Sequence, residues 1–502
     1  MDGDPTKATS QLSRTSSIPT VFFLPQTAIN EAPVLNVKDY GAKGDGTTLD
    51  TPAINQAIEA AANKGGGTVW IPAGTYKSVS IHLKSNVALY LDQGATLKAA
   101  KGGYDEAEPN PSNKYQDYGH THFQNSLLWG IKLKNVSIEG PGEIDGEGLV
   151  TSSDAKTPTE GNKAISLREC QNVTLKDFTI RHGGWFGILA TGVDHLTIDN
   201  LKIDTDRDGM DIDCCRDVHV SNCTVNSPSD DGICLKSSYA LGYARATEDL
   251  TITNCHVSGF KEGTVLDGTY VKQGGTGRIK FGTESNGGFK NIAISNCVFD
   301  DCCGLALETV DGADLEDVTI SNIVMRDISN SPIFLRLGRR MRGPAGTPIG
   351  HLRHISISNI TVDGARESSI IAGIPDHPIE DVKLTDIKIE SHGGAPADQA
   401  NTLPPEKETS YPEPESFGKM PSHGFFVRHV KGIQFHDLQL ETKTPDARPP
   451  FTLSDVDGID LFLIKSARTT AFATLENVKD LQTRMVDGTP DSKQASVATG
   501  KL

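Results

Sequence analysis

One pattern of hydrophobic and polar positions recurs along most of the chain: apolar-x-apolar-x-Asn-x-x-apolar. The clearest copies are VHVSNCTV (218–225), LTITNCHV (250–257), IAISNCVF (292–299), VTISNIVM (318–325) and ISISNITV (355–362). Weaker copies are VTLKDFTI (173–180), LTIDNLKI (196–203), VKLTDIKI (382–389) and IQFHDLQL (433–440). Alternation with a period of two predicts short β-strands with one buried face. The tightest interval between copies is 22 residues, from Leu196 to Val218.

A repeat with a period in the twenties and no helical segment between its copies indicates a solenoid. Leucine-rich repeats share this period, but here Val and Ile dominate the apolar positions, which favours a parallel β-helix. Stacked coils lie about 4.8 Å apart, so a recurring asparagine would form a hydrogen-bonded ladder, and Asn tolerates the left-handed turn that such a position requires. The ladder residues are Asn222, Asn254, Asn296, Asn322 and Asn359. We therefore predict an all-β fold, a single parallel β-helix.

The segment DTPAINQAIEAAANKGGG (50–67) predicts one helix, at about 50–64, that covers the open N-terminal end of the solenoid. Thr51 is its expected cap, with Pro52 at the first helical position and Gly65 after the end. We expect a mobile leader or cloning remnant at 1–30, the β-helix catalytic domain at 31–490 and a tail at 491–502. Long insertions are expected at 239–248, 260–280, 338–350 and 401–424. The insertion 338–350 is basic, and it could be a solvated loop or a wall of a substrate cleft.

Composition narrows the possible partners. The 502-residue chain carries a net charge of −17, which argues against a nucleic-acid partner or an anionic membrane surface. No apolar run approaches the ~20 residues of a membrane span. The nine cysteines include no CxxC pair, so we expect no zinc site. We also expect no other metal and no cofactor. Most of the thiols are expected to be structural, with one or two disulfides as the alternative.

Acidic residues mark the candidate chemistry. Asp230 and Asp231 stand together in NSPSDDGICLKSS (226–238), and Asp208 in DTDRDGMDID (204–213) precedes them by 22 and 23 residues, one coil of the predicted solenoid. Three stacked carboxylates should raise at least one pKa. Such a cluster suits hydrolysis of a glycosidic bond, in which one protonated carboxyl donates to the leaving oxygen and others activate water. The alternative is that each Asp-Gly is solvated turn chemistry.

At these residues the sequence resembles glycoside hydrolase family 28, the polygalacturonase and rhamnogalacturonase family, as a divergent bacterial-type member. The likeness runs from KDYGAKGDGTTLDTPAINQAI (38–58) through GEIDGEG (142–148) to the late coils; DRDGMDI (206–212) resembles the family's NTDGIDI and DDGICLKS (230–237) its DDCIAIKS. The resemblance implies a right-handed β-helix and inverting hydrolysis of a pectic or related plant glycan. It places Asp230 as general acid, Asp208 and Asp231 as water-activating residues, and Lys236 on a family lysine.

Two departures concern the substrate. TGRIKFGTE (276–284) replaces the family's GHGISIGSE, so its histidine is absent, as it is in rhamnogalacturonases. GLALET (304–309) stands where polygalacturonases carry GLRIKT, so Glu308 replaces a carboxylate-binding lysine, and the only RIK, 278–280, falls in another coil. A glutamate repels a uronate and accepts hydrogen bonds from a neutral sugar. The reaction is therefore better supported than galacturonate as the sugar at the cleaved bond.

Residues on the same face, within a few coils of the aspartates, are candidate substrate contacts: Arg278, Lys280, Glu284, Glu308, Lys236, Trp185 and His182. Core packing is the alternative for Trp185, and ion pairing along a strand edge is the alternative for Arg278 and Lys280. The long insertions could close one end of a groove, which favours exo-action on chain ends or oligosaccharides.

Two rival functions remain open. A β-helix lyase would hold Ca²⁺ with these acids and use Arg278 as base, whereas a non-catalytic β-helix would only bind glycan. Localisation follows from the substrate: plant polymers are met outside the cytoplasm, so a secreted or periplasmic protein is expected, although residues 1–17 lack the form of a secretory signal.

Overall fold

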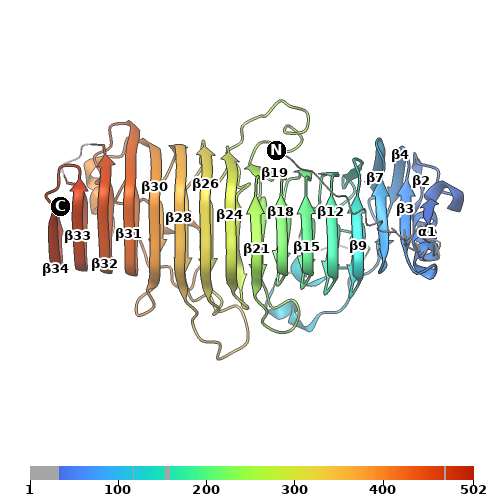
Figure 1. Cartoon of the computed structure of the whole chain (residues 1–502), viewed down its shortest axis with the longest axis horizontal. Coiled ribbons are helices and arrows are strands. Elements are labelled where there is room, and N and C mark those ends of the chain that lie inside the picture. Colours follow the sequence, from blue (N-terminus) through green and yellow to red (C-terminus); the bar gives the residue numbers. More distant parts are fainter. Residues whose placement is uncertain (1–32, 117, 153–158, 468–470) are drawn as a thin grey trace, which may run out of the picture.

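The computed structural model describes residues 33–116, 118–152, 159–467 and 471–502; the leader predicted at 1–30 lies outside them. The described chain winds into one right-handed parallel β-helix whose strands stack along the long axis of the molecule (Figure 1). Within the described residues, no helix has the length and apolar character needed to cross a bilayer. The predicted fold class is confirmed.

Each early coil contributes one strand to each of three faces. The first face contains β5 (Ile81–His82), β8 (Leu128–Ile131), β11 (Lys163–Arg168), β14 (Phe186–Thr191), β17 (Asp208–Asp213), β20 (Ile233–Ser237), β23 (Ile279–Ser285), β25 (Leu305–Thr309), β27 (Ile333–Leu337) and β29 (Ser369–Ala372). The second face begins with β1 (Val34–Asn36), β3 (Gly67–Ile71), β6 (Val87–Leu91), β9 (Lys134–Glu139), β12 (Gln171–Lys176), β15 (Asp194–Asp199), β18 (Arg216–Ser221) and β21 (Thr247–Thr253). The third begins with β2 (Asp45–Leu49), β4 (Gly74–Ser78), β7 (Ala95–Ala99), β10 (Glu143–Asp145), β13 (Thr179–Arg181), β16 (Lys202–Asp204), β19 (Thr224–Asn226) and β22 (His256–Ser258).

In the later coils the second and third faces join in single long strands. These are β24 (Phe289–Asp300), β26 (Leu315–Arg326), β28 (Leu352–Ala365) and β30 (Ile379–Gly393). The last coils run almost unbroken in β31 (Phe425–Thr444), β32 (Phe451–Ser466) and β33 (Ala473–Val486). The pairings from coil to coil are parallel, for example Leu196 opposite Val218. The register shifts within the pairs β2–β4, β20–β23 and β28–β30.

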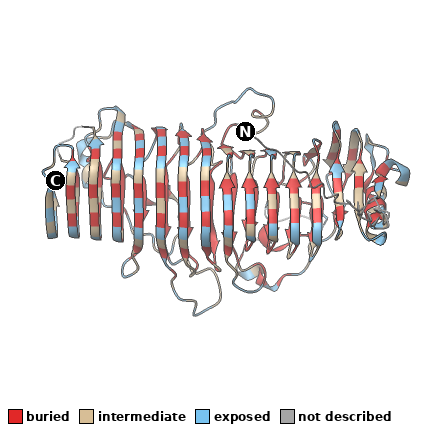
Figure 2. Cartoon of the chain, in the orientation of Figure 1, coloured by how far each residue is buried: buried red, intermediate tan, exposed pale blue. Residues whose placement is uncertain are grey.

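The alternating pattern of the sequence builds the core. Buried and exposed positions alternate along the strands of the second face (Figure 2), and the inward Val, Ile and Leu side chains form one continuous cluster from Leu35 to Val486. Burying a side chain of this kind contributes about 1.5–3 kcal/mol. Cys223, Cys255 and Cys297 are part of this cluster. All nine cysteines lie in described segments, and all are free thiols.

The asparagine ladder is confirmed. All five predicted asparagines have positive φ, between 53° and 58°. Asn322 donates from Nδ2 to Asn296 Oδ1 at 3.0 Å, and Asn359 donates to Asn322 at 2.7 Å. Asn254 donates to Asn222 at 3.4 Å. The recurring residue therefore stabilises one corner of the coil, and it is not part of a binding site.

Both ends of the solenoid are covered. Helix α1 (Thr51–Asn63) packs Ile54, Ile58 and Ala61 onto the first coils, as predicted, but its N-cap is Asp50, whose carboxylate accepts from the backbone of Lys43 and Gly44. At the other end, the segment expected to be a tail contains β34 (Ser492–Lys501), which pairs antiparallel with β33. The division into domains stays a prediction.

Two excursions cover the first face on either side of β17 and β20. The earlier one contains η2 (Pro111–Lys114) and α2 (Tyr118–Thr121) and packs Phe123 against Phe186 and Leu189; it was not among the predicted insertions. The later one contains η3 (Ala397–Asn401) and η4 (Pro414–Phe417), and it packs Phe417 and Met420 against outward side chains of β27, β29 and β31. The remaining short element is η1 (Val37–Tyr40).

Candidate active site

The three predicted acids meet at the start of two neighbouring strands. β17 pairs with β20 so that Met210 lies opposite Ile233, which puts Asp208 and Asp231, each two residues earlier, in the same column. Carboxylate oxygens of Asp208, Asp230 and Asp231 lie within 4.8 Å of one another. The spacing of 22–23 residues therefore corresponds to one coil, as expected, and brings the acids together.

Asp230 is the acid of this group that solvent can reach. Its side chain is 26% exposed, whereas those of Asp208 and Asp231 are almost fully buried. Its Oδ2 pairs with Arg207, whose guanidinium lies over the ring of Trp185 at 4.0 Å from the ring centroid. Trp185 is therefore linked to Asp230 by way of Arg207. Arg207 covers one face of the Trp185 ring, which was a candidate for stacking on a sugar.

Asp231 is held by the two cations of the displaced RIK. Arg278 donates from Nε to Asp231 Oδ1 at 2.8 Å, and Lys280 Nζ lies 3.5 Å from Oδ2. Both cations also contact Glu413, from the excursion between β30 and β31: Arg278 Nη2 at 2.7 and 3.0 Å, and Lys280 Nζ at 3.1 Å. No pattern in the sequence predicts that Glu413 lies here.

The environment raises the pKa of two of the three acids. Burial, with the neighbouring charges of Asp211 and Asp230, raises the pKa of Asp208 well above its usual range. Burial and Asp231 raise the pKa of Asp230, while Arg207 opposes that increase. Carboxylates so close share protons, so at neutral pH the group can contain both a proton donor and an ionised acid.

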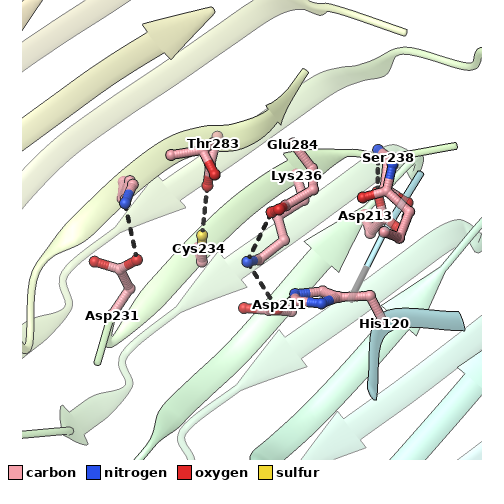
Figure 3. Close-up of polar contacts among 12 residues, drawn as sticks. His120, Asp211, Asp213, Asp231, Cys234, Lys236, Ser238, Thr283 and Glu284 are labelled. Carbon is pink, nitrogen blue, oxygen red and sulfur yellow. Dashed lines mark hydrogen bonds and ion pairs between the residues drawn. The ribbon is translucent and has the colours of Figure 1, made fainter. Parts of the chain in front are cut away.

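A second ionic cluster continues along the first face (Figure 3). Lys236 Nζ lies between Glu284 Oε2, at 3.1 Å, and Asp211 Oδ2, at 3.5 Å, with His120 beside Asp211 at 3.6 Å. Burial raises the pKa of Asp211 to about 8 and lowers that of His120 to about 3. Burial would raise the pKa of Glu284, but neighbouring cations led by Lys236 hold it well below its usual range.

The basic insertion at 338–350 joins this cluster. Arg342 Nη2 donates to Glu284 Oε1 at 2.6 Å, and Arg340 donates from Nε to Asp311 Oδ1 at 3.0 Å. The interpretation of this insertion as a solvated loop was therefore incomplete, because two of its arginines are tied to carboxylates on the first face. Arg339 remains about half exposed.

The remaining predicted contacts lie differently. Glu308 is fully buried, with Oε2 3.7 Å from Lys280 Nζ, and burial raises its pKa to about 8. His182 Nδ1 pairs with Asp145 Oδ1 at 2.9 Å, a coil away from the aspartates. The structure thus brings Arg278 and Lys280 to the catalytic candidates, groups Lys236 with Glu284 and leaves His182 apart.

The three aspartate oxygens are close enough together to serve as ligands of a cation. Three protein cations already face these acids, however: Arg207 on Asp230, and Arg278 and Lys280 on Asp231. Their positive charge opposes that of a metal ion at the same place.

Sequence reasoning missed three functional candidates: Arg207, Tyr411 and Glu413. Arg207 stands beside Asp208 in the chain, and its charge, where the family carries threonine, was an available signal. Tyr411 Oη lies 3.4 Å from Lys280 Nζ, and its side chain remains half exposed. Tyr411 and Glu413 lie in an irregular segment, where no repeat indicates position.

Comparison with known proteins gives one family. The model described as rhamnogalacturonase A/epimerase, pectate lyase-like, matches residues 34–333. An exo-poly-α-D-galacturonosidase of Dickeya chrysanthemi is 30% identical over 277 residues, covering 53% of this chain and 40% of that protein. A mannuronan C5-epimerase, AlgE3, of Azotobacter vinelandii is 28% identical over 204 residues, 37% of this chain and 11% of that protein.

Among solved structures, the family 28 exopolygalacturonase of Yersinia enterocolitica superposes with a TM-score of 0.65 at 20% identity, covering 86% of this chain and 78% of that one. This likeness supports the fold. The chain matches less than half the length of either curated relative.

Proposed function

The chain belongs to the rhamnogalacturonase A/epimerase, pectate lyase-like family, and we propose that it is a glycoside hydrolase acting on pectic or related plant glycans. The observation that carries the proposal is the cluster of three carboxylates within 4.8 Å, one of them reachable from solvent. Like charges at this distance are unfavourable, and clusters of this kind mark functional sites. The exopolygalacturonosidase relative supports this substrate class.

The proposed reaction assigns one role to each acid. Protonated Asp230, the exposed member, donates its proton to the glycosidic oxygen as the bond to the anomeric carbon breaks. Asp208 and Asp231 orient a water whose oxygen bonds to that carbon, and one of them accepts the water's proton. Arg278 and Lys280 hold the carboxyl group of Asp231 in place.

Inversion of configuration is part of the proposal and rests on the family resemblance. The spacing of the acids is shorter than the ~6.5–9.5 Å typical of inverting pairs, so geometry alone does not support it. Proton NMR of the first products distinguishes the two outcomes: an inverted anomer is expected, and a retained anomer would assign a nucleophile to the group.

Action at chain ends is supported by the two excursions that cover the first face on both sides of the acids. We expect release of short products from the end of a pectic chain, with little early loss of viscosity. A rapid fall in viscosity at low conversion would indicate internal cleavage.

The decisive test is removal of each acid. Asp208→Asn, Asp230→Asn and Asp231→Asn should each lower kcat by several orders of magnitude without a change in fold or in substrate affinity. Asp217→Asn is the matched control, because Asp217 lies on β18, on the second face of the solenoid, and is half exposed, paired with His195. Near-normal turnover of Asp230→Asn on the true substrate would refute the assignment of the acid, and unaltered function would favour a non-catalytic, glycan-binding β-helix.

A lyase or epimerase is the second candidate, because the acids could hold a cation and an epimerase is among the relatives. Arg278 is poorly suited as the base. Burial disfavours its charge, but Glu413 and Asp231 hold its pKa well above its usual range, so it remains protonated. Activity lost in EDTA, with products that absorb in the ultraviolet, would establish the lyase; a hydrolase shows neither.

Two further assignments follow from the same proposal. Residues 31–490 act as the catalytic domain, and the protein acts outside the cytoplasm, where pectic polymers are met. Cell fractionation checks the location: activity confined to the cytoplasm would contradict it.

A further inference from the structure

We propose that Glu413 is a specificity-determining residue: an internal carboxylate that occupies the anion site formed by Arg278 and Lys280 and thereby excludes a uronate from the sugar position beside Asp231. The position then takes a neutral glycosyl residue. This inference rests on the proposed function, because it names the substrate class of that same site.

The contacts of Glu413 are those expected of a bound sugar carboxylate. Arg278 reaches both of its oxygens, at 2.7 and 3.0 Å, and Lys280 reaches one, at 3.1 Å. Both contacts from Arg278 come from its Nη2, while its Nε donates to Asp231. Hydrogen bonds between a charged donor and a charged acceptor are the strong ones. Both cations are almost completely buried and also contact Asp231. The anion site therefore exists beside the reacting group, and it is already filled.

Counting charges explains why a second carboxylate is excluded. Arg278 and Lys280 supply two positive charges, and Asp231 and Glu413 supply two negative ones. Burial disfavours the charge on Glu413, yet the two cations lower its pKa to about 2, so it remains ionised. A uronate bound here would add a buried negative charge with no partner, which costs several kcal/mol. A neutral sugar adds none.

The excursion holds Glu413 in place. Glu413 is the residue before η4, and its backbone carbonyl accepts hydrogen bonds from the backbone N–H and the hydroxyl of Ser416. One turn later, Phe417 and Met420 are buried against Phe334 and Ile370 on the first face. The carboxylate is therefore fixed by packing on both the helical turn and the sheet, and it is not a freely moving surface group.

Glu308 is a second carboxyl group beside Lys280. Its Oε2 lies 3.7 Å from Lys280, and its pKa of about 8 keeps it protonated at neutral pH. Burial is the main cause of the raised pKa of Glu308; the charge of Lys280 lowers this pKa and the charge of Glu413 raises it. Removing the charge of Glu413 would therefore lower the pKa of Glu308. Glu308 could then ionise and neutralise Lys280 in its turn. A complete test must therefore include a variant in which both carboxyls are amides.

The experiment compares two probes that differ only at the carboxyl. Digalacturonate and its carboxyl-reduced counterpart, α-1,4-digalactose, are titrated by calorimetry into Asp230→Asn protein, with Glu413→Gln and Glu413→Gln/Glu308→Gln added in turn. We expect affinity for digalacturonate to rise roughly tenfold to hundredfold, the value of one charged hydrogen-bonded contact, with the larger gain in the double variant. Affinity for digalactose should change little.

Glu415→Gln is the matched control, because Glu415 lies on the same turn and is exposed. An unchanged ratio of the two affinities in both Glu413 variants, or an equal change in Glu415→Gln, would overturn the proposal. So would tighter binding of digalacturonate than of digalactose when Glu413 is intact. Because binding is measured without turnover, loss of the hydrolase assignment would appear separately, as normal turnover in Asp230→Asn.

Discussion

The pairing of Arg207 with Asp230 predicts a specific change in pH dependence. A general acid must carry its proton, so the rate falls as the pH rises through the pKa of Asp230. Arg207 lowers that pKa, against the effects of burial and of Asp231. Replacing Arg207 with glutamine should therefore raise the pKa and move the alkaline limb of the kcat/KM profile to higher pH.

The size of the shift follows from the contact. Two unit charges about 4 Å apart attract by about 4 kcal/mol at an effective dielectric constant of about 20, which corresponds to ~3 pKa units at ~1.36 kcal/mol per unit. The side chains of Arg207 and Asp230 are 23% and 26% exposed. Solvent screens pairs of this kind, so we expect a shift of about 1 unit.

The assay is kcat/KM against pH for the wild type, Arg207→Gln and Arg207→Lys, the last of which keeps the charge and should move the limb less. Arg216→Gln is the control, because it removes an arginine of the same coil that pairs with Glu248 on the second face. An alkaline limb that does not move in Arg207→Gln, or that moves equally in Arg216→Gln, would refute the assignment of Asp230 as the acid held by Arg207.

Two further substitutions test the geometry around the acids. Gly209→Ala would place a Cβ 2.4 Å from Val225 Cγ1 and 2.5 Å from the carbonyl oxygen of Gly232, so we expect a loss of about 1–3 kcal/mol in the free energy of unfolding and a lower kcat. The control, Gly102→Ala, has its nearest atom at 3.9 Å and should change neither quantity. Equal stability of the two variants in chemical denaturation would contradict the expectation. Tyr411→Ala should raise KM severalfold with kcat little changed, because the half-exposed ring lies beside Lys280; Tyr411→Phe should keep most of the affinity, and a KM equal to that of the wild type in the alanine variant would remove Tyr411 from the site.

The sequence predicts most of the fold because the physics of a solenoid is local. Each coil repeats the same alternation, so the pairing of Leu196 with Val218 follows from the 22-residue interval alone. The same interval places Asp208 beside Asp230 and Asp231. The acids are therefore predictable from spacing once the repeat is recognised.

Contacts made by the excursions are not predictable in this way. Glu413 lies 135 residues from Arg278, in a segment with no period that would fix its position. The earlier excursion, which buries Phe123 on the first face, has no repeat either and was not anticipated. The N-cap of α1 was assigned one residue late, because Asp50 and Thr51 are both suitable cap residues and only the backbone geometry decides between them.

The place where the later excursion leaves the solenoid has a consequence for how this protein could diversify. β30 and β31 stay paired in register, with Val382 opposite Ile433, although the whole excursion lies between them. Insertions, deletions or substitutions in 401–424 therefore need not shift any coil. The aspartates lie at the start of β17 and just before β20, several coils from the point where this segment leaves the solenoid. Under the function and the role of Glu413 proposed above, changes confined to this segment would alter which sugar is bound and would leave the coils that contain the aspartates unchanged.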